Sequence, residues 1–513
     1  MKNNSNLDTA RLAKNSVILY ARMLLTMAIG LYTSRVILRE LGVVDYGLYN
    51  VLGGVVSLFG FIQGSLRNAS WRYITVSLGK GDFFNLQKTY STAIYVHLIF
   101  SLLLILISET VGLWFFYNKM VIPETRINEA FWVYQISILT AVFSVMSSPS
   151  NSLILAHEKM SAFAYLSIYE SIAKLFIVFL LVLFPHDKLL FYSILICIVQ
   201  GSVRVSYFLY CRYNFKESKL IRLFDINLIR EMSIFSGFTI LPGLGIAGCG
   251  QGLNLLLNIF FGPSVNAARG ISVQVQHLVV SFINSFQQAF SPQITKLYAS
   301  NQLDKMHKLV SKTAKFSFYL FFIPSMLIIF NIDYILKLWL DNVPDDTSSF
   351  CIYTLLISMT ETISYPFLVG AAANGKIKKY YTINGILLIM VVPIAYIFLK
   401  LGFSPISVYI SHFAFSILVM YSRVRLGADL INYKIKKIPS EIITPVLAVS
   451  TISALCGFFL KHLFNVNDFW DFVMYMMLYG ILLLAIVLIV GMKKDERQFV
   501  IKSAISILKK FKN

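Results

Sequence analysis

Long apolar runs recur along the whole chain, and they constrain the fold more than any other feature. Each is about 20 residues long, the length at which an α-helix crosses the roughly 30 Å hydrocarbon core of a bilayer. The runs lie near residues 15–38, 43–65, 89–116, 131–155, 161–184, 189–210, 233–261, 265–290, 313–340, 347–372, 380–400, 405–424, 442–463 and 470–492. A β-barrel would show alternating segments of about ten residues instead. The sequence therefore predicts an all-α polytopic membrane protein with about fourteen transmembrane helices.

The composition agrees with such a protein. Only 14% of the residues are charged and 57% are hydrophobic, whereas a soluble domain carries about 25% charged residues. The five cysteines lie far apart and form no CxxC pair, which argues against a disulfide framework and against a zinc site. The chain also lacks the GxxxxGK[ST] frame of an ATP-binding loop, so we expect no nucleotide hydrolysis and no cofactor.

Basic residues of the loops gather on one side of the predicted membrane. With fourteen spans both termini share a side, and that side carries about 33 Lys and Arg residues against about 7 on the other. The positive-inside rule then places both termini in the cytoplasm. This topology accounts for most of the net charge of +20, so nucleic-acid binding is not needed to explain it.

The sequence also repeats weakly within itself. When the sequence is shifted against itself, Gly42 falls on Gly262, and nearly the same shift brings Pro149 onto Pro366. This near-constant shift predicts two parallel repeats of six spans related by an axis along the membrane normal, as in many transporters. The predicted parts are an N-terminal six-helix lobe (1–215), a cytoplasmic amphipathic linker (216–232), a C-terminal six-helix lobe (233–424), two additional spans (442–492) and a basic cytoplasmic tail (493–513).

Ionisable side chains inside the spans are the first candidates for a functional site. Such a group costs about 2.5–3.5 kcal/mol on insertion scales and usually faces a cavity or a partner. Arg22 lies about 10 Å inside the first span and has no acid within a turn. Arg269 lies in a span rich in amides, among them Gln274, which suits water or sugar better than lipid. We therefore expect both arginines to face a cavity.

Other charged groups in the spans have two interpretations each. Glu170 and Lys174 are four residues apart and can pair on one helix face, as a structural or a functional pair. Arg35 lies near a helix end, where it either snorkels to the surface or faces the cavity. Asp45 either caps the second span or takes part in ion coupling. Glu361 lacks a local partner and is a candidate proton or cation site.

A cavity with a net positive charge suits an anionic substrate such as a lipid pyrophosphate, because Arg binds phosphate with two parallel hydrogen bonds. Amides and tyrosines of spans one, two, seven and eight are candidate contacts for sugar hydroxyls and rings. Packing, or a place in the interfacial aromatic belt, is the alternative for them. They are Tyr32, Tyr46, Tyr49, Asn50, Gln63, Gln251, Asn254 and Asn258.

The first 90 residues carry a family resemblance. Lys14-Asn15-Ser16 leads into the span with Arg22, the segment "RVILRELGVVDYGLYNV" (35–51) turns into the second span, and "ITVSLGKGD" (74–82) follows. In these segments the chain resembles the Wzx-type O-antigen or polysaccharide-unit flippases of bacteria. They belong to the superfamily that also holds multidrug and toxin exporters and lipid II flippases. Fourteen spans rather than twelve departs from the commonest Wzx pattern.

The resemblance implies a function and a site. It implies two six-helix lobes in a V shape, alternating access, and flipping of an undecaprenyl-pyrophosphate-linked oligosaccharide from the cytoplasmic to the periplasmic leaflet of the inner membrane. The implied partners are that lipid-linked oligosaccharide, membrane lipids, a polysaccharide polymerase and a chain-length regulator, without nucleic acid. The expected substrate-binding residues are Arg22, Arg269, Arg35, Lys174, Gln251, Asn254 and Gln274, and the expected ion-coupling residues are Glu361, Asp45 and Glu170.

Three other functions remain open. A multidrug exporter of the same fold would prefer acids in its cavity to attract cationic drugs. A membrane enzyme such as a polysaccharide polymerase would carry a large outer loop, and the longest predicted outer loop spans only about 14 residues, 117–130. The seven histidines show no motif. A passive channel would need a ring of like residues from repeated subunits, which one sequence does not display.

Overall fold

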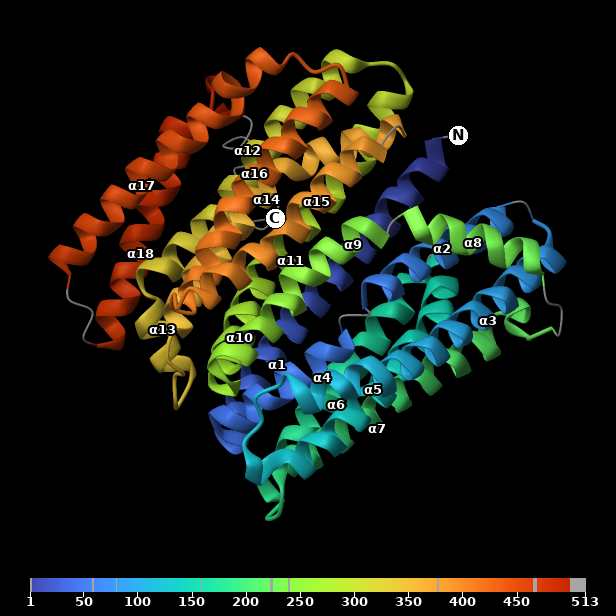
Figure 1. Ribbon diagram of the computed structural model, residues 1–513. Coiled ribbons are helices and arrows are strands. Elements are labelled where there is room, and N and C mark those ends of the chain that lie inside the picture. The colour runs from blue at the N-terminus through green and yellow to red at the C-terminus, as the bar shows by residue number, and fades with distance from the viewer. Residues whose placement is uncertain are drawn as a thin grey trace. The chain divides into compact units, whose positions relative to one another are not determined.

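The structure is a computed structural model that describes residues 2–57, 60–79, 81–157, 159–221, 225–238, 240–375, 378–464 and 468–498 (Figure 1). Within these ranges every regular element is a helix. The side chain of Arg22 and those of several other helical residues, mostly in 2–23, 55–62 and 233–242, lie outside the described part. The predicted all-α architecture is confirmed.

The N-terminal half begins with one long helix that a glycine interrupts. In α1, Gly42 has φ 77° and ψ 170°, a conformation open essentially only to glycine. The chain therefore turns between the first two predicted spans. The elements of this half are α1 (Lys2–Ser57), α2 (Gly60–Gly79), α3 (Phe83–Ile107), η1 (Ser108–Gly112), α4 (Leu113–Asn118), η2 (Glu124–Arg126), α5 (Ile127–Ala156), α6 (Met160–Leu183) and α7 (Lys188–Asn214).

The remaining elements begin with a short connecting segment, which comprises η3 and α8. They are η3 (Lys216–Ser218), α8 (Ile226–Phe238), α9 (Ile240–Ala247), η4 (Gly248–Gly252), α10 (Leu253–Phe261), α11 (Pro263–Ala299), α12 (Leu303–Phe330), α13 (Ile332–Trp339), α14 (Thr347–Asn374), α15 (Lys378–Lys400), α16 (Ile406–Leu430), η5 (Ile435–Lys437), η6 (Pro439–Ile443), α17 (Thr444–Leu463), α18 (Phe469–Ile486) and η7 (Val487–Gly491). The connecting segment holds α8, whose first turn is capped by Asp225. Lys88 contacts the same carboxylate at 2.6 Å, and this hydrogen bond lowers the pKa of Asp225.

Ten helical segments of the described chain are long and apolar enough to cross a membrane. They include ten of the fourteen predicted spans. The other four predicted spans fall on the first arm of α1, on the second arm of α1 together with the start of α2, on α11 and on α16, all of them helical where the structure describes them. The structure is therefore that of a polytopic membrane protein, and the count of fourteen stays a prediction.

Helix boundaries follow the predicted repeat. Helix α3 begins at Phe83 and α12 at Leu303, and this separation equals the shift that brings Gly42 onto Gly262. Helices α5 and α14, which begin at 127 and 347, have the same separation, and the starts of α6 and α15 and of α7 and α16 differ from it only slightly. Gly262 ends α10 with φ 80° and ψ −174°, nearly the angles of Gly42. The same backbone turn thus recurs in both repeats.

The chain forms two compact units. The first comprises Met1–Ile271, Trp339–Thr347 and Asn384–His412, and the second comprises Ser272–Leu338, Ser348–Ile383 and Phe413–Asn513. In the first unit α5 packs against α2, α3 and α7. In the second unit the additional helices α17 and α18 pack against α12. The predicted lobe boundaries stay a prediction.

A buried ion pair fastens the end of the described chain to the second unit. Lys315 of α12 donates to both carboxylate oxygens of Glu496, at 2.9 and 2.8 Å. The two side chains are 2% and 5% exposed. Tyr319, one turn further along α12, donates to the carbonyl of Gly491 at 3.0 Å. The segment after α18 is therefore held against α12.

Candidate functional site

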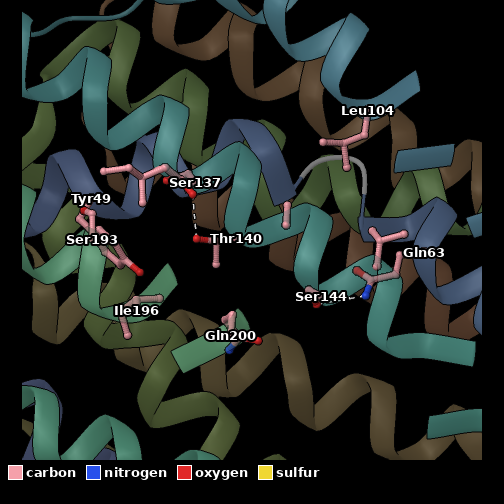
Figure 2. Close-up of a pocket in the computed structure, with 13 residues that line it drawn as sticks. Tyr49, Gln63, Leu104, Ser137, Thr140, Ser144, Ser193, Ile196 and Gln200 are labelled. Atoms are coloured by element: carbon pink, nitrogen blue, oxygen red, sulfur yellow. Dashed lines mark hydrogen bonds between the residues drawn. The ribbon is translucent and has the colours of Figure 1, made fainter. Parts of the chain in front are cut away.

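The first unit contains a cavity of about 270 Å³ (Figure 2). Helices α1, α2, α3, α5 and α7 supply its wall. The lining residues are Tyr49, Gly53, Gln63, Leu104, Ile136, Ser137, Thr140, Ala141, Ser144, Val145, Ser193, Ile196 and Gln200. None of the lining residues that the structure describes is ionisable at neutral pH, so the cavity is uncharged, with polar side chains in a largely apolar wall.

Helix α5 supplies three hydroxyls to this wall. Ser137, Thr140 and Ser144 lie at positions i, i+3 and i+7, which share one helix face. Ser137 and Thr140 each donate to the carbonyl four residues earlier, at 2.7 Å. On α7, Ser193 does the same at 2.9 Å. Because these protons are used within the helices, the hydroxyl oxygens remain as acceptors at the cavity.

Two amides complete the polar lining. Gln63 of α2 donates its Nε2 proton to Ser144 at 3.2 Å, and the two lie on the same side of the cavity in Figure 2. Gln200 of α7 donates its Nε2 proton to Glu170 of α6 at 3.0 Å. Each amide keeps a carbonyl oxygen as an acceptor. The wall therefore suits a neutral group that carries many hydrogen-bond donors.

An aromatic and aliphatic surface faces these polar groups. The Tyr49 ring meets Tyr192 edge-on, with the ring centroids 4.8 Å apart. Leu104, Ile136 and Ile196 also line the cavity. A ligand with both hydroxyl groups and apolar ring faces matches this combination, because each type of surface finds its counterpart.

The ion pair predicted from its spacing is present. Lys174 donates to Glu170 at 2.6 Å within α6. The same carboxylate oxygen accepts the bond from Gln200, so the pair lies directly behind the cavity wall. A change of charge at Glu170 would alter the hydrogen bonding of a residue that lines the cavity.

Asp45 lies in a cluster of charged side chains near the Gly42 turn. Arg126 contacts the carboxylates of both Asp45 and Asp187, and Asp45 is only 7% exposed. Lys188 donates to Glu40 at 2.6 Å. This hydrogen bond keeps the pKa of Glu40 below its ordinary value, although burial acts in the opposite direction. The cluster joins α1 to the first residues of α5 and α7.

Arg35 is exposed and pairs with an acid from a distant segment. Its guanidinium donates to Asp341 at 2.9 Å, and the two side chains are 43% and 36% exposed. The side chain thus lies at the surface of the first unit and does not line the described cavity.

Arg269 is buried in a cage of oxygen atoms. Its guanidinium donates to the carbonyls of Cys249 and Gly250 at 2.9 and 2.7 Å and to the hydroxyl of Tyr409 at 3.1 Å. Both carbonyls belong to the π-helix η4, whose widened turn directs backbone oxygens away from the regular helical pattern. Arg269 therefore stabilises an irregular turn, and only 7% of it is exposed.

The amides predicted as sugar contacts pack between α1, α10 and α11. Asn266 donates to the backbone and side-chain oxygens of Asn254 at 2.7 and 2.8 Å, and Asn258 donates to Asn266 at 3.1 Å. A Cβ atom on Gly54 would lie 2.8 Å from Oε1 of Gln251. Gln251 and Asn254 thus contact α1 closely, and Asn254 is 6% exposed.

Two predicted residues belong to the second unit. Glu361 of α14 lies 3.8 Å from Arg423 and is 55% exposed. Gln274 lies on α11 and is half-buried. Arg22 lies on α1, and its side chain is outside the described residues. None of the ten predicted site residues lines the described cavity. Glu170 is linked to the cavity wall by the hydrogen bond from Gln200.

Tyr49 and Gln63 were predicted as candidate sugar contacts, whereas the hydroxyls of α5 and Gln200 were not. Ser and Thr are common in membrane helices because their hydroxyls bond the backbone of the same helix. The available signal was the spacing of Ser137, Thr140 and Ser144 on one face. In the described part of the chain, no three His, Cys, Asp or Glu side chains gather as metal ligands.

Comparisons with known proteins identify the fold. No protein-family model matches the chain, and no curated protein matches its sequence. Among solved structures, an inward-facing multidrug resistance MATE family transporter of the MOP superfamily matches with a TM-score of 0.64 and 13% identity, covering 80% of this chain and 94% of that one. The lipid II flippase MurJ matches with a TM-score of 0.62 and 13% identity, covering 92% and 98%. This chain has the MOP-superfamily fold.

A third structure with this fold shows that the binding pocket of the MOP fold varies. A MOP-superfamily transporter from Pyrococcus furiosus matches with a TM-score of 0.58 and 15% identity, covering 82% of this chain and 96% of that one. Its description reports a binding pocket of reversed polarity that suggests a different function. The fold alone therefore does not identify the substrate, which has to be inferred from the side chains of each protein. All three structures are of transporters or flippases.

Proposed function

We propose that this protein flips an undecaprenyl-pyrophosphate-linked oligosaccharide from the cytoplasmic to the periplasmic leaflet of the bacterial inner membrane by alternating access. The observation that carries the proposal is the uncharged, acceptor-rich cavity of the first unit. Sugar hydroxyls donate to the oxygens of Ser137, Thr140 and Ser193, and a sugar ring packs against Tyr49. Both termini face the cytoplasm in this orientation.

The pyrophosphate needs cationic partners, and arginine suits it because the guanidinium forms two parallel hydrogen bonds. Arg22 and Arg269 have this role in the proposal, with Arg35 and Lys174 as further cations and Gln251, Asn254 and Gln274 as polar contacts. One guanidinium nitrogen of Arg269 donates to both carbonyls of η4, so a phosphate that binds at this nitrogen displaces them. Substrate binding at Arg269 would then change the backbone of the π-helix.

Glu170 is the coupling residue that the contacts favour. When ionised, it accepts hydrogen bonds from Lys174 and from Gln200 of the cavity wall. A proton on Glu170 weakens both bonds and frees the amide of Gln200 to turn toward the cavity. Asp45 and Glu361 have cationic neighbours as well, Arg126 and Arg423, so what distinguishes Glu170 is the hydrogen bond that it accepts from Gln200 of the cavity wall. An ion gradient would thus act on the sugar site through one side chain.

Multidrug export is the second candidate, and the MATE structures with the same fold favour it. A cationic drug needs a carboxylate near its binding site. Glu170 is available behind Gln200, but Lys174 already neutralises it. In multidrug export Glu170 would attract the cationic drug itself. In flipping, Glu170 binds the coupling ion and the neutral wall binds sugar.

A deletion strain distinguishes the two functions. If the proposal is correct, cells without the protein accumulate lipid-linked oligosaccharide at the cytoplasmic leaflet and lose surface polysaccharide, while their susceptibility to cationic drugs is unchanged. The variants Arg22→Ala, Arg269→Ala and Gln200→Ala test the site in the complemented strain. Normal polysaccharide together with increased drug susceptibility would favour the multidrug exporter. A polysaccharide polymerase and a chain-length regulator are the proposed protein partners, and cross-linking in the same strain tests them.

A further inference from the structure

A second cavity lies in the other compact unit, where α16 ends and the chain turns toward α17. Its volume is about 170 Å³. The lining residues are Met420, Tyr421, Val424, Arg425, Ile435, Ile438, Pro439 and Ile443. Arg425 is the single charged group among these described residues. The cavity is therefore an apolar pocket with one cation at its edge.

The pocket continues into exposed apolar surfaces on α16 and α17. Tyr421 is 67% exposed, and Ile417, one turn earlier on α16, is 43% exposed. On the other side, Leu447 of α17 lies one turn beyond Ile443 and is 59% exposed. An apolar track thus leads from the pocket along both helices, and a hydrocarbon chain can lie in it.

The edge of the pocket is strongly basic. Lys434, Lys436 and Lys437 flank the lining residue Ile435 in the short turn η5, and all three lysines are at least partly exposed. Arg425 completes a group of four cations at the place where two helices leave the membrane. Cations in this position attract acidic lipid head groups at roughly 1 kcal/mol each.

Two acids lie near these cations, and neither neutralises the group. Asp429 lies 3.8 Å from Arg425 on the same helix, and both are about half exposed. Glu441 accepts hydrogen bonds from Ser311 at 3.1 Å and from the Tyr433 hydroxyl at 2.7 Å, so its carboxylate is used in fixing η6 to α12. Glu441 also attracts Lys437 electrostatically, so the cations still exceed these two acids by two.

We propose that this pocket binds an anionic phospholipid of the surrounding leaflet. One acyl chain occupies the pocket between α16 and η6 and continues along Ile417 and Leu447. The phosphate of the head group lies among Arg425, Lys436 and Lys437. The apolar floor and the cationic edge are adjacent, as the two parts of a phospholipid are, whereas a soluble phosphate would use the edge alone.

The site is independent of the proposed transport substrate. It lies in the second unit, and none of its residues takes part in the sugar cavity or in the pyrophosphate contacts proposed above. A lipid bound there joins α16 to the segment that carries α17 and α18. We therefore expect the bound lipid to stabilise the attachment of the two additional helices.

The test measures lipid binding by the purified full-length protein. Native mass spectrometry and thermal unfolding are recorded with phosphatidylglycerol, phosphatidylcholine, inorganic phosphate and undecaprenyl phosphate. The triple variant Arg425→Gln, Lys436→Gln, Lys437→Gln removes the cationic edge. A double variant of another exposed basic pair, Lys378→Gln and Lys379→Gln, is the matched control. Ile438→Trp fills the pocket without changing the charge.

Phosphatidylglycerol is expected to bind at least about tenfold more tightly than phosphatidylcholine, and the triple variant is expected to lose this preference while the control double variant keeps it. Ile438→Trp is expected to weaken both lipids. Equal binding of the two phospholipids, or an unchanged triple variant, would overturn the proposal. So would stabilisation by inorganic phosphate alone, or displacement of phosphatidylglycerol by equimolar undecaprenyl phosphate. If Ile438→Trp does not fold, the charge variants still decide.

Discussion

The two repeats place different side chains seven residues after the same glycine turn. In the N-terminal repeat Tyr49 follows Gly42, lines the cavity and meets Tyr192 edge-on. In the C-terminal repeat Arg269 follows Gly262 and bonds Tyr409. The backbone turn is the same in both repeats, so the repeats differ here in which contacts the side chain makes. Tyr49 lines the cavity, whereas Arg269 donates to two carbonyls of η4 and to the Tyr409 hydroxyl.

Matched positions of the cavity wall differ at Gln200 and agree at Thr140. Gln200 of α7 lines the cavity, and the residue at the matching position of α16 is Leu418, which is 50% exposed. Thr140 of α5 lines the cavity, and its counterpart in the second repeat is Thr360 of α14. We therefore predict that the neutral cavity of the first repeat, rather than the matching positions of the second, binds the substrate. Variants at matched positions test this prediction.

The largest effect is expected from filling the first cavity. Thr140→Phe places an aromatic ring in a space of about 270 Å³, and transport of the lipid-linked oligosaccharide should fall by roughly 100-fold because a sugar ring no longer fits. The measurement is flipping by purified protein in liposomes, normalised to the amount inserted. Thr360→Phe is the matched control and should retain most of the transport. Equal loss in both variants would contradict the asymmetry of the repeats.

Arg269 should matter for stability, and Tyr49 for transport. Arg269→Leu leaves two carbonyls of η4 and the Tyr409 hydroxyl without their donor, and we expect the free energy of unfolding to fall by about 3 kcal/mol. Tyr49→Phe removes a hydroxyl that hydrogen-bonds Tyr192, and we expect a smaller loss, about 1 kcal/mol. Thermal unfolding in detergent measures both. A stable Arg269→Leu protein without transport would show that Arg269 serves the substrate alone.

The sequence was informative where the physical signal is local or periodic. Apolar length predicted a polytopic helical protein, the near-constant shift between the two halves anticipated the matching turns at Gly42 and Gly262, and the spacing of Glu170 and Lys174 predicted their pair. Each of these depends on residues near one another in sequence or on a repeated pattern.

The site escaped prediction because its contacts join distant segments. Arg126 was counted only as a loop cation, yet it holds Asp45, 81 residues earlier in the chain. The partners of Arg269 are backbone carbonyls exposed by a π-helix, and side-chain identity does not reveal such a turn. The cavity hydroxyls of α5 look like ordinary helical Ser and Thr until α1, α2, α3 and α7 enclose them.

The glycine turns should be equally sensitive in the two repeats. Gly42→Ala and Gly262→Ala each place a Cβ atom in a backbone conformation that costs about 1–3 kcal/mol for other residues. Both variants should lower the unfolding temperature to a similar extent. Gly30→Ala, in a helical part of α1 with no atom within 4 Å of the added Cβ, is the control and should be neutral or slightly stabilising. A strong effect at only one of the two turns would show that they are not equivalent.

Variants of the Glu170–Lys174 pair test whether the pair is only structural or whether Glu170 also carries the coupling ion. Glu170→Gln leaves Lys174 charged without its partner, and we expect a loss of about 1 kcal/mol in stability. Adding Lys174→Met should restore the stability because no uncompensated charge remains. Transport should stay low in the double variant if Glu170 carries the coupling ion. Full recovery of transport and of its dependence on the ion gradient would show that the pair is structural only.

The smallest effect concerns acid stability at the charged cluster near Gly42. The hydrogen bond from Lys188 lowers the pKa of Glu40 from its ordinary value of 4.5. A lowered pKa in the folded state means that the stabilisation is complete above about pH 4.5 and is lost as the pH falls through the folded-state pKa. Glu40→Gln should therefore reduce stability by a few tenths of a kcal/mol at pH 7 and flatten the decline below pH 4.5. Glu124→Gln, at an exposed acid two residues before Arg126, should leave the acid profile unchanged. Identical profiles for wild type and Glu40→Gln would show that the pair with Lys188 contributes nothing to holding α1 against α7.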